Sequence, residues 1–207
     1  AGGRLLMDVK VLLKDEEAVR AAISIGQALI EVKIETQFAF WSRLEEKLLA
    51  AGYTITEYWK YSRQKIEAYH KKGPRGYGLI LTLPELLGQD VLGCYVGMDY
   101  SRVYYGIITL EDGLPVATAR DSSFALPVEI LKNLSDTWRL GTYSVGWRPS
   151  KRQIEFANFD TPDTLALIDP AKRDAYLDEL VEEVTAAIEQ FYAACEHDPR
   201  LTEQPEW

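Results

Sequence analysis

A long apolar run near the start of the chain constrains its fold more than any other feature. Six apolar residues recur there at steps of three, four and seven, the spacing of one face of an amphipathic helix: Ile23, Ile30, Ile34, Trp41, Leu44 and Leu48. Asp15-Glu16-Glu17 places acidic side chains where a helix begins, and Gly52 is a typical C-terminal stop. Residues 30–35 also alternate as a half-buried strand does, so a strand there is the alternative to one continuous helix.

A second amphipathic run lies near the end of the chain. Pro170 precedes it, and proline suits the first turn of a helix. Seven apolar residues then line one face: Leu177, Leu180, Val181, Val184, Ile188, Phe191 and Cys195. The other face is dense in carboxylates, as a solvated helix surface is. We therefore expect a long C-terminal helix.

Strand signals fill the region between the two runs. Apolar or tyrosine-rich stretches bounded by turn residues predict strands at 53–59, 77–83, 92–98, 102–109, 116–119 and 143–147. Shorter helices are expected at 62–72 and 127–134. Together these elements predict one α+β domain over residues 1–207. In it, a mainly antiparallel sheet of about five strands packs with a long N-terminal helix and a long C-terminal helix.

The composition is that of a globular protein, since 47% of the 207 residues are hydrophobic and 27% are charged. Two cysteines, Cys94 and Cys195, are too few for a disulfide scaffold and indicate reduced thiols in a cytoplasmic protein. No apolar run approaches the roughly 20 residues that span a bilayer, and no signal peptide is visible. We therefore expect no membrane contact.

The net charge of −9 is unevenly distributed. Residues 155–207 carry 14 acidic and 3 basic side chains, whereas residues 1–154 carry 18 acidic and 20 basic ones. The acidity therefore belongs to the tail, and it does not exclude a polyanionic partner for the rest of the chain.

The stretch from 60 to 75 is the best candidate for binding such a partner, because it has six basic residues and one acidic residue, Glu67. The predicted DNA-binding residues are Lys60, Arg63, Lys65, Lys71, Lys72 and Arg75, interleaved with aromatic residues that can stack on bases. A solvated surface with the tyrosines packed inward is the alternative. Trp138-Arg139 and the stretch 147–152 form a second basic-aromatic cluster, in which the tryptophans suit core anchors as well as a binding role.

No complete catalytic motif is present, because the sequence lacks a nucleophile elbow, a phosphate-cradling glycine loop and a dinucleotide fingerprint. His70 and His197 are too isolated for a metal site, so we expect no metal and no cofactor. One alternative is a compact Mg²⁺-dependent DNA nuclease. On a strand, Glu31 and Lys33 share a face, and Asp8 could supply the second carboxylate. Another is a protein–protein interaction domain whose acidic last helix pairs with a partner or with a second copy in a homodimer.

Several short motifs follow one another in a recognisable order: Phe40-Trp41-x-x-Leu44-Glu45-x-x-Leu48, the basic stretch from Tyr61 to Tyr69, Tyr77-Gly78-Leu79, Tyr104-Tyr105-Gly106, Trp147 and Asn158-Phe159. Over residues 30–195 this order resembles the C-terminal region of bacterial proteins in the PD-(D/E)XK nuclease superfamily. The resemblance implies a catalytic domain upstream, with an acidic-x-lysine strand followed by a glutamine.

Glu31-Val32-Lys33 lies too close to Phe40-Trp41 to be that catalytic strand, so no catalytic residue is assigned. The resemblance therefore implies a non-catalytic C-terminal fragment of a longer nuclease-like protein. Such a module would assist DNA engagement or self-association. An opening Ala1-Gly2-Gly3 without methionine agrees with this expectation.

Overall fold

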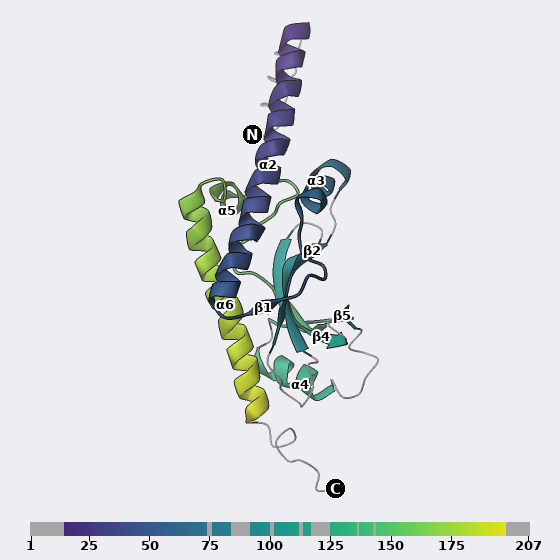
Figure 1. Cartoon of the computed structure of the whole chain (residues 1–207), viewed down its shortest axis with the longest axis vertical. Helices are drawn as coiled ribbons and strands as arrows, with labels where there is room; N and C mark the ends of the chain where they lie inside the picture. Colours follow the sequence, from purple (N-terminus) through teal and green to yellow (C-terminus); the bar gives the residue numbers. More distant parts are fainter. Residues whose placement is uncertain are drawn as a thin grey trace.

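The computed structural model describes residues 15–73, 76–83, 92–99, 102–111, 114–116, 125–135, 137–142 and 144–197. Helices cover one face of an antiparallel sheet (Figure 1), which confirms the predicted α+β class. The helices are α2 (Glu16–Ala50), α3 (Arg63–Lys72), α4 (Ala125–Leu134), α5 (Pro162–Ala166) and α6 (Pro170–Glu196). None of these helices combines the length and the apolar character needed to cross a bilayer.

Among the described residues, four strands of six or more residues make up the centre of the sheet: β2 (Tyr77–Thr82), β3 (Leu92–Asp99), β4 (Arg102–Glu111) and β7 (Ser144–Pro149). Shorter strands complete it: β1 (Thr54–Ile55), β5 (Leu114–Pro115) and β6 (Arg139–Gly141). The order is β1-β2-β3-β4-β7-β6, each pairing between these described strands is antiparallel, and β5 pairs with the end of β4.

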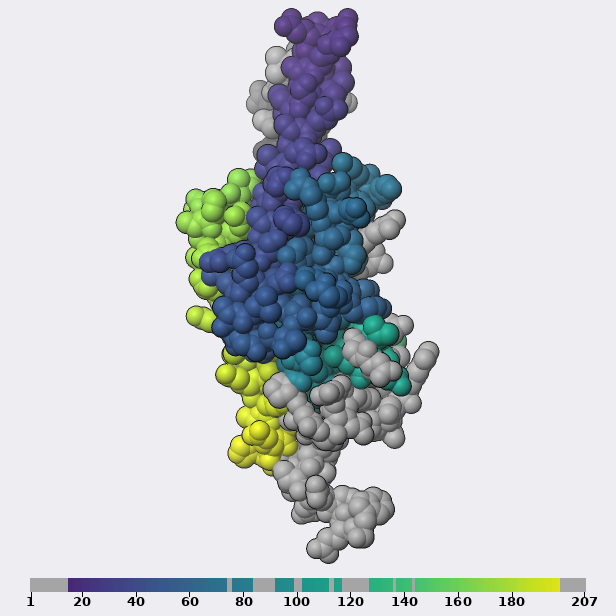
Figure 2. Space-filling view, in the orientation of Figure 1, coloured from purple at the N-terminus to yellow at the C-terminus, as the bar shows by residue number. Residues whose placement is uncertain are grey.

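Helix α2 is continuous, so the strand considered for residues 30–35 does not form. Asp15 caps its start by accepting a hydrogen bond from the amide of Ala18 at 2.8 Å, and Gly52 follows its end with a φ of +92°. From Ile34 to Leu48 the apolar face is buried against the sheet and α6, which favours the helix over local β-propensity. The N-terminal part of α2 extends beyond the described body of the molecule (Figure 1 and Figure 2).

Helix α6 forms as predicted, and it runs beside α2 over the same face of the sheet. Its cap, Asp169, accepts hydrogen bonds from the first amides of the helix. Arg43 and Lys47 of α2 form ion pairs with Asp174 and Asp178 of α6. Some of the carboxylates of α6 therefore form ion pairs that link it to α2.

Aromatic rings fill the core beneath these helices. Phe40 is fully buried, and its ring centroid lies 5.1 Å from that of Trp41, 5.3 Å from Phe156 and 5.9 Å from Tyr176. The Phe-Trp pair near the end of α2 thus joins α2 to α6 and to the turn after β7. The pairs with Trp41 and Phe156 are edge-to-face and the pair with Tyr176 is stacked, and such ring geometries add specificity to apolar burial.

The sequence-based elements differ from the structure in several places. Of the strand expected at 53–59, only Thr54–Ile55 forms a regular strand beside β2; Thr56 still donates to the Ile80 carbonyl at 2.9 Å, and Trp59 has a φ of +60°. Helix α4 begins two residues before the expected 127, and α5 and β6 were not predicted. For the strand expected at 116–119, pairing is seen at Leu114–Pro115 instead, and residues 117–119 lie outside the described residues.

Candidate functional site

The face of the sheet opposite the helices carries its own set of large side chains. Successive residues of a strand point to opposite faces, so Leu79, Val96 and Tyr105 enter the main core while Tyr95 and Tyr104 lie on the other face. Tyr95 is paired across β3 and β4 with Gly106, which in turn is paired across β4 and β7 with Trp147. Aromatic residues and glycines therefore alternate across this outer face.

Glycines let the aromatic side chains pack closely against the backbone of the sheet. A Cβ added to Gly97 would overlap Cζ and Oη of Tyr95, so the Tyr95 ring occupies the space above Gly97. A Cβ on Gly106 would come within 2.8 Å of the Trp147 Cβ and within 2.5 Å of the Gly146 carbonyl oxygen. At both positions the absence of a side chain lets an aromatic residue cover the backbone closely.

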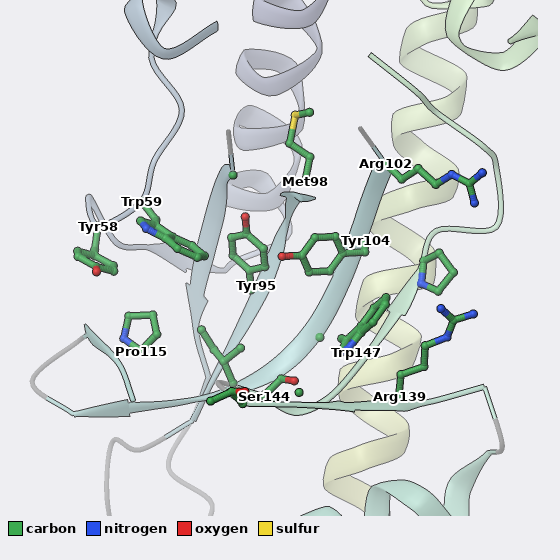
Figure 3. Close-up of a pocket in the computed structure, with 16 residues that line it drawn as sticks. Tyr58, Trp59, Tyr95, Met98, Arg102, Tyr104, Pro115, Arg139, Ser144 and Trp147 are labelled. Atoms are coloured by element: carbon green, nitrogen blue, oxygen red, sulfur yellow. The ribbon is translucent and has the colours of Figure 1, made fainter. Parts of the chain in front are cut away.

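Four rings form one row across the sheet (Figure 3). Their centroids lie 5.4 Å apart from Trp59 to Tyr95, 5.4 Å from Tyr95 to Tyr104, and 5.6 Å from Tyr104 to Trp147. The Arg139 guanidinium continues the row from strand β6, with its central carbon 5.3 Å from the Trp147 ring centroid. These residues come from the loop before α3 and from strands β3, β4, β7 and β6, so only the assembled sheet brings them together.

Trp59 borders this row in an unfavourable backbone conformation. A φ of +60° is rare for a bulky residue and costs about 1–2 kcal/mol. The residue is 44% exposed, and its ring stacks on that of Tyr58 with an angle of 4° between the ring planes. The Gly78 amide donates to the Trp59 carbonyl at 3.2 Å, which holds the loop against β2. Trp59 is therefore a strained and partly exposed residue at the edge of the sheet. Residues with such backbone conformations cluster at functional sites.

A cavity of about 880 Å³ opens over the row. Arg102 and Arg139 are the charged side chains among its described lining residues, which include no aspartate, glutamate, asparagine or glutamine. Thr142 and Ser144 add hydroxyl groups at one end. The cavity thus offers flat π surfaces and two cations, and it suits a ligand with planar rings and negative charge.

The described residues among the six predicted to bind DNA lie elsewhere, around α3, and three of them have carboxylate partners. Lys60 Nζ lies 2.9 Å from Glu45 and 2.8 Å from Glu57, and these carboxylates raise the pKa of Lys60. Arg63 pairs with Glu35 and Glu67, whose carboxylate Lys71 also approaches at 3.9 Å.

The other three predicted residues are Lys65, Lys72 and Arg75. The Lys65 ammonium donates to the Lys60 carbonyl oxygen. Lys72 is exposed in the last turn of α3, and Arg75 lies outside the described residues. Carboxylates from α2 therefore neutralise part of this surface, and DNA binding by the six residues stays a prediction.

The second basic-aromatic cluster divides between the two faces of the sheet. Arg139 and Trp147 lie in the cavity, whereas Trp138 and Arg148 lie on the helix-covered face. The Arg148 guanidinium stacks 4.6 Å from the Trp138 centroid, and its Nε donates to the Tyr105 hydroxyl. That hydroxyl donates to Glu183 of α6 at 3.0 Å. Trp138 and Arg148 thus anchor the sheet to α6.

Sequence reasoning missed Tyr95 and Tyr104 as site residues. Each is followed by a glycine two positions later, so the ring and the glycine share one face of a strand. This tyrosine-x-glycine spacing in two strands was the sequence signal that could have identified them. Together with Trp147 it marks the outer face.

The residues proposed for a nuclease site do not form one. Glu31 and Lys33 lie in α2, so the strand that this hypothesis requires is absent, and Asp8 lies outside the described residues. Lys33 Nζ donates instead to the carbonyl oxygen of Asn158 at 3.2 Å. Within the described part of the chain, no three His, Cys, Asp or Glu side chains are grouped to hold a metal ion.

A buried polar chain lies beside Lys33. Gln37 is fully buried, accepts a hydrogen bond from His70 Nε2 at 2.7 Å, and donates to the Met98 sulfur at 3.0 Å. Burial and the nearby charge of Lys33 lower the pKa of His70 to about 4. The imidazole is therefore neutral at physiological pH and links α3 to α2 and β3.

Comparisons with known protein families, with characterised proteins and with solved structures return no match to this chain.

Proposed function

We propose that this chain is a non-catalytic module of a PD-(D/E)XK nuclease-like protein and that it engages single-stranded DNA on the outer face of its sheet. The observation that carries the proposal is the row of rings from Trp59 to Trp147, continued by Arg139, over a glycine-containing floor. Antiparallel sheets that bind single strands use aromatic side chains in this way, stacking two or three bases on the sheet surface. The nuclease context rests on the motif order described above.

The chemistry of the cavity favours nucleotides over sugars. Aromatic platforms bind both, but a sugar also needs several hydrogen-bonding groups for its hydroxyls. The described lining residues hold no carboxylate or carboxamide, whereas Arg102 and Arg139 suit phosphate oxygens. A single strand is favoured over a duplex because duplex bases are stacked on one another and their faces are not free to meet a ring.

Binding of a fluorescein-labelled oligothymidylate, measured by fluorescence anisotropy, tests this proposal. Stacking on one ring contributes about 1–3 kcal/mol, so Trp147→Ala should weaken binding about 5- to 150-fold. Leu165→Ala, an exposed side chain on α5, is the matched control and should leave the affinity unchanged. Wild-type protein that does not bind the oligonucleotide, or a Trp147→Ala variant that binds as wild type does, overturns the proposal.

Salt dependence tests the role of Arg139. Each phosphate neutralised on a single strand contributes about −0.7 to the slope of log affinity against log salt concentration. Arg139→Gln should therefore make the slope shallower by about 0.7, while Arg20→Gln, an exposed change on α2, should not alter it. The triple variant Lys65→Glu, Lys71→Glu, Lys72→Glu separates the two surfaces. Loss of binding there, with Trp147→Ala unaffected, assigns DNA to α3 instead.

A further inference from the structure

The two arginines that line the cavity differ from the other described arginines in their lack of a partner. Six of the eight arginines whose side chains the structure describes donate hydrogen bonds or form ion pairs: Arg20, Arg43, Arg63, Arg148, Arg152 and Arg173. The remaining two are Arg102 and Arg139, and neither side chain has a hydrogen-bond or ion-pair partner among the described residues. Both residues are exposed and line the cavity. A guanidinium is always charged and has several N–H donors, so these two cations are available to an anion.

The two arginines lie on the same side of the cavity. Arg139 belongs to β6, the last strand of the described sheet, and its guanidinium lies against the Trp147 ring. Arg102 is two residues before Tyr104 on β4, so these two side chains share the outer face of the sheet. Figure 3 shows both guanidinium groups on the Trp147 side of the aromatic row, whereas Trp59 lies on the opposite side. The cavity is therefore polarised, with its positive charge at one end and a partly exposed tryptophan at the other.

No described residue supplies a matching cation at the aromatic end. Lys60 follows Trp59 in the chain, but its ammonium group is paired with Glu45 and Glu57. Each nucleotide inside a strand brings one negatively charged phosphate. A strand that crossed the whole row by its interior would therefore place phosphates beside Trp59, where the described lining residues offer no positive charge. The distribution of charge instead fits a ligand whose own negative charge is concentrated at one end.

We propose that the arginine side of the cavity binds the terminal phosphate of a single strand, so that the module engages DNA ends in preference to internal stretches. This inference rests on the function proposed above. A terminal phosphomonoester carries a charge of about −1.5 to −2 near pH 7 and three acceptor oxygens, whereas an internal phosphodiester carries a single negative charge. Planar guanidinium groups bind such oxygens through paired hydrogen bonds. The terminal base then stacks on Trp147, and the next bases lie along the row toward Trp59.

Competition against a bound probe tests the proposal. The probe is an oligothymidylate of about eight nucleotides with fluorescein on an internal base, so that both ends stay free, and its displacement is followed by fluorescence anisotropy. Unlabelled competitors of the same length carry a 5′-phosphate, a 3′-phosphate or hydroxyl groups at both ends. At least one phosphorylated competitor should displace the probe at a concentration about tenfold or more below that of the hydroxyl-ended strand, because it adds charge-assisted hydrogen bonds. The more effective of the two identifies the end that is bound.

Substitution of the arginines tests their role in this preference. Arg102→Gln and Arg139→Gln should each reduce the ratio between the phosphorylated and hydroxyl-ended competitors to about threefold or less, because each removes one of the two cations. Both residues are exposed, so the circular dichroism spectra should match that of the wild type. Arg20→Gln, an exposed change on α2, is the matched control and should keep the wild-type ratio. A preference for the phosphorylated strand that persists in both cavity variants overturns the assignment to these arginines.

A circular oligothymidylate separates this inference from the proposed function. It has the same bases and phosphodiesters but no end, so it should compete no better than the hydroxyl-ended strand. If the circular strand competes as well as the phosphorylated strands do, or if all the linear competitors are equal, the inference about ends is overturned while stacking on the aromatic row stands. If the wild-type protein does not bind the probe at all, the proposed function fails, and the inference fails with it.

Discussion

Replacing His70 with glutamine should make the protein lose less stability when the pH is lowered. His70 Nε2 donates a hydrogen bond to the buried Gln37, and the amide nitrogen of a glutamine can make the same bond without being able to ionise. The imidazole cannot easily take up a proton in the folded state. Its surroundings are desolvated and it faces the positive charge of Lys33, so its pKa falls to about 4.

The sign and size of the effect follow from this lowered pKa. In the unfolded chain the histidine has a pKa of about 6.5, so below that pH the unfolded state binds a proton that the folded state does not. Stability is therefore complete above about pH 6.5 and falls as the pH is lowered toward about 4. At pH 5 the full difference corresponds to about 2 kcal/mol. Because the ring is partly exposed and water screens its charge, we expect a loss of about 1–2 kcal/mol.

Urea unfolding followed by tryptophan fluorescence at pH 8 and at pH 5 measures this loss. Acidic groups such as Asp174 also titrate, with a pKa lowered by Arg43 and Lys47, so the comparison is between proteins at the same two pH values. The free energy of unfolding should drop by about 1–2 kcal/mol less in His70→Gln than in the wild type. If both proteins lose the same free energy between pH 8 and pH 5, the reasoning about His70 is refuted.

A second variant identifies the cause of the low pKa. Lys33→Met keeps an unbranched side chain over the Phe159 ring but removes the charge near the imidazole. The folded-state pKa of His70 should then rise toward its ordinary value, and the acid-dependent loss should become smaller than in the wild type. An unchanged loss in Lys33→Met would assign the low pKa to burial alone.

Two further predictions concern the two faces of the sheet. Phe40→Ala should lower the free energy of unfolding by about 3–5 kcal/mol, because it removes a fully buried ring that contacts three others. A loss below about 1 kcal/mol in urea unfolding would show that this part of the core repacks. Gly97→Ala should cost about 1–3 kcal/mol, since displacing the Tyr95 ring disrupts its packing against Trp59 and Tyr104. In a Tyr95→Ala background the same change should cost much less, and equal costs in the two backgrounds would contradict the proposed overlap.

Elements with a strong periodic pattern were predictable from the sequence. The 35-residue helix α2 and the 27-residue helix α6 each repeat an apolar face several times, and that repetition outweighs local exceptions. Residues 30–35 are such an exception, because their alternation alone suits a strand. The buried positions on either side of them decide for the helix. Short elements such as β6 and α5 contain too few residues to show any period, so they were missed.

The candidate site was less accessible to sequence reasoning. The basic stretch from 60 to 75 is conspicuous along the chain, but Glu35 and Glu45, which partner Arg63 and Lys60, lie 28 and 15 residues before them on another helix. Pairing across helices is invisible in a count of charges. The residues of the aromatic row are likewise separated along the chain, and a strand pattern does not reveal which face is left without a covering helix.

Periodicity and end signals in the sequence by themselves determined the two long helices, the central antiparallel strands and the α+β class, because these depend on hydrogen bonds and apolar spacing within short stretches of chain. Only the tertiary structure decided which face of the sheet has no covering helix, which basic side chains pair with carboxylates, and where α2 stops packing against the rest of the molecule. Those outcomes depend on contacts between distant segments. The packing of α2 and α6 on one face leaves Tyr104 and Trp147 half-buried on the other face, beside the cavity, with Tyr95 buried next to them.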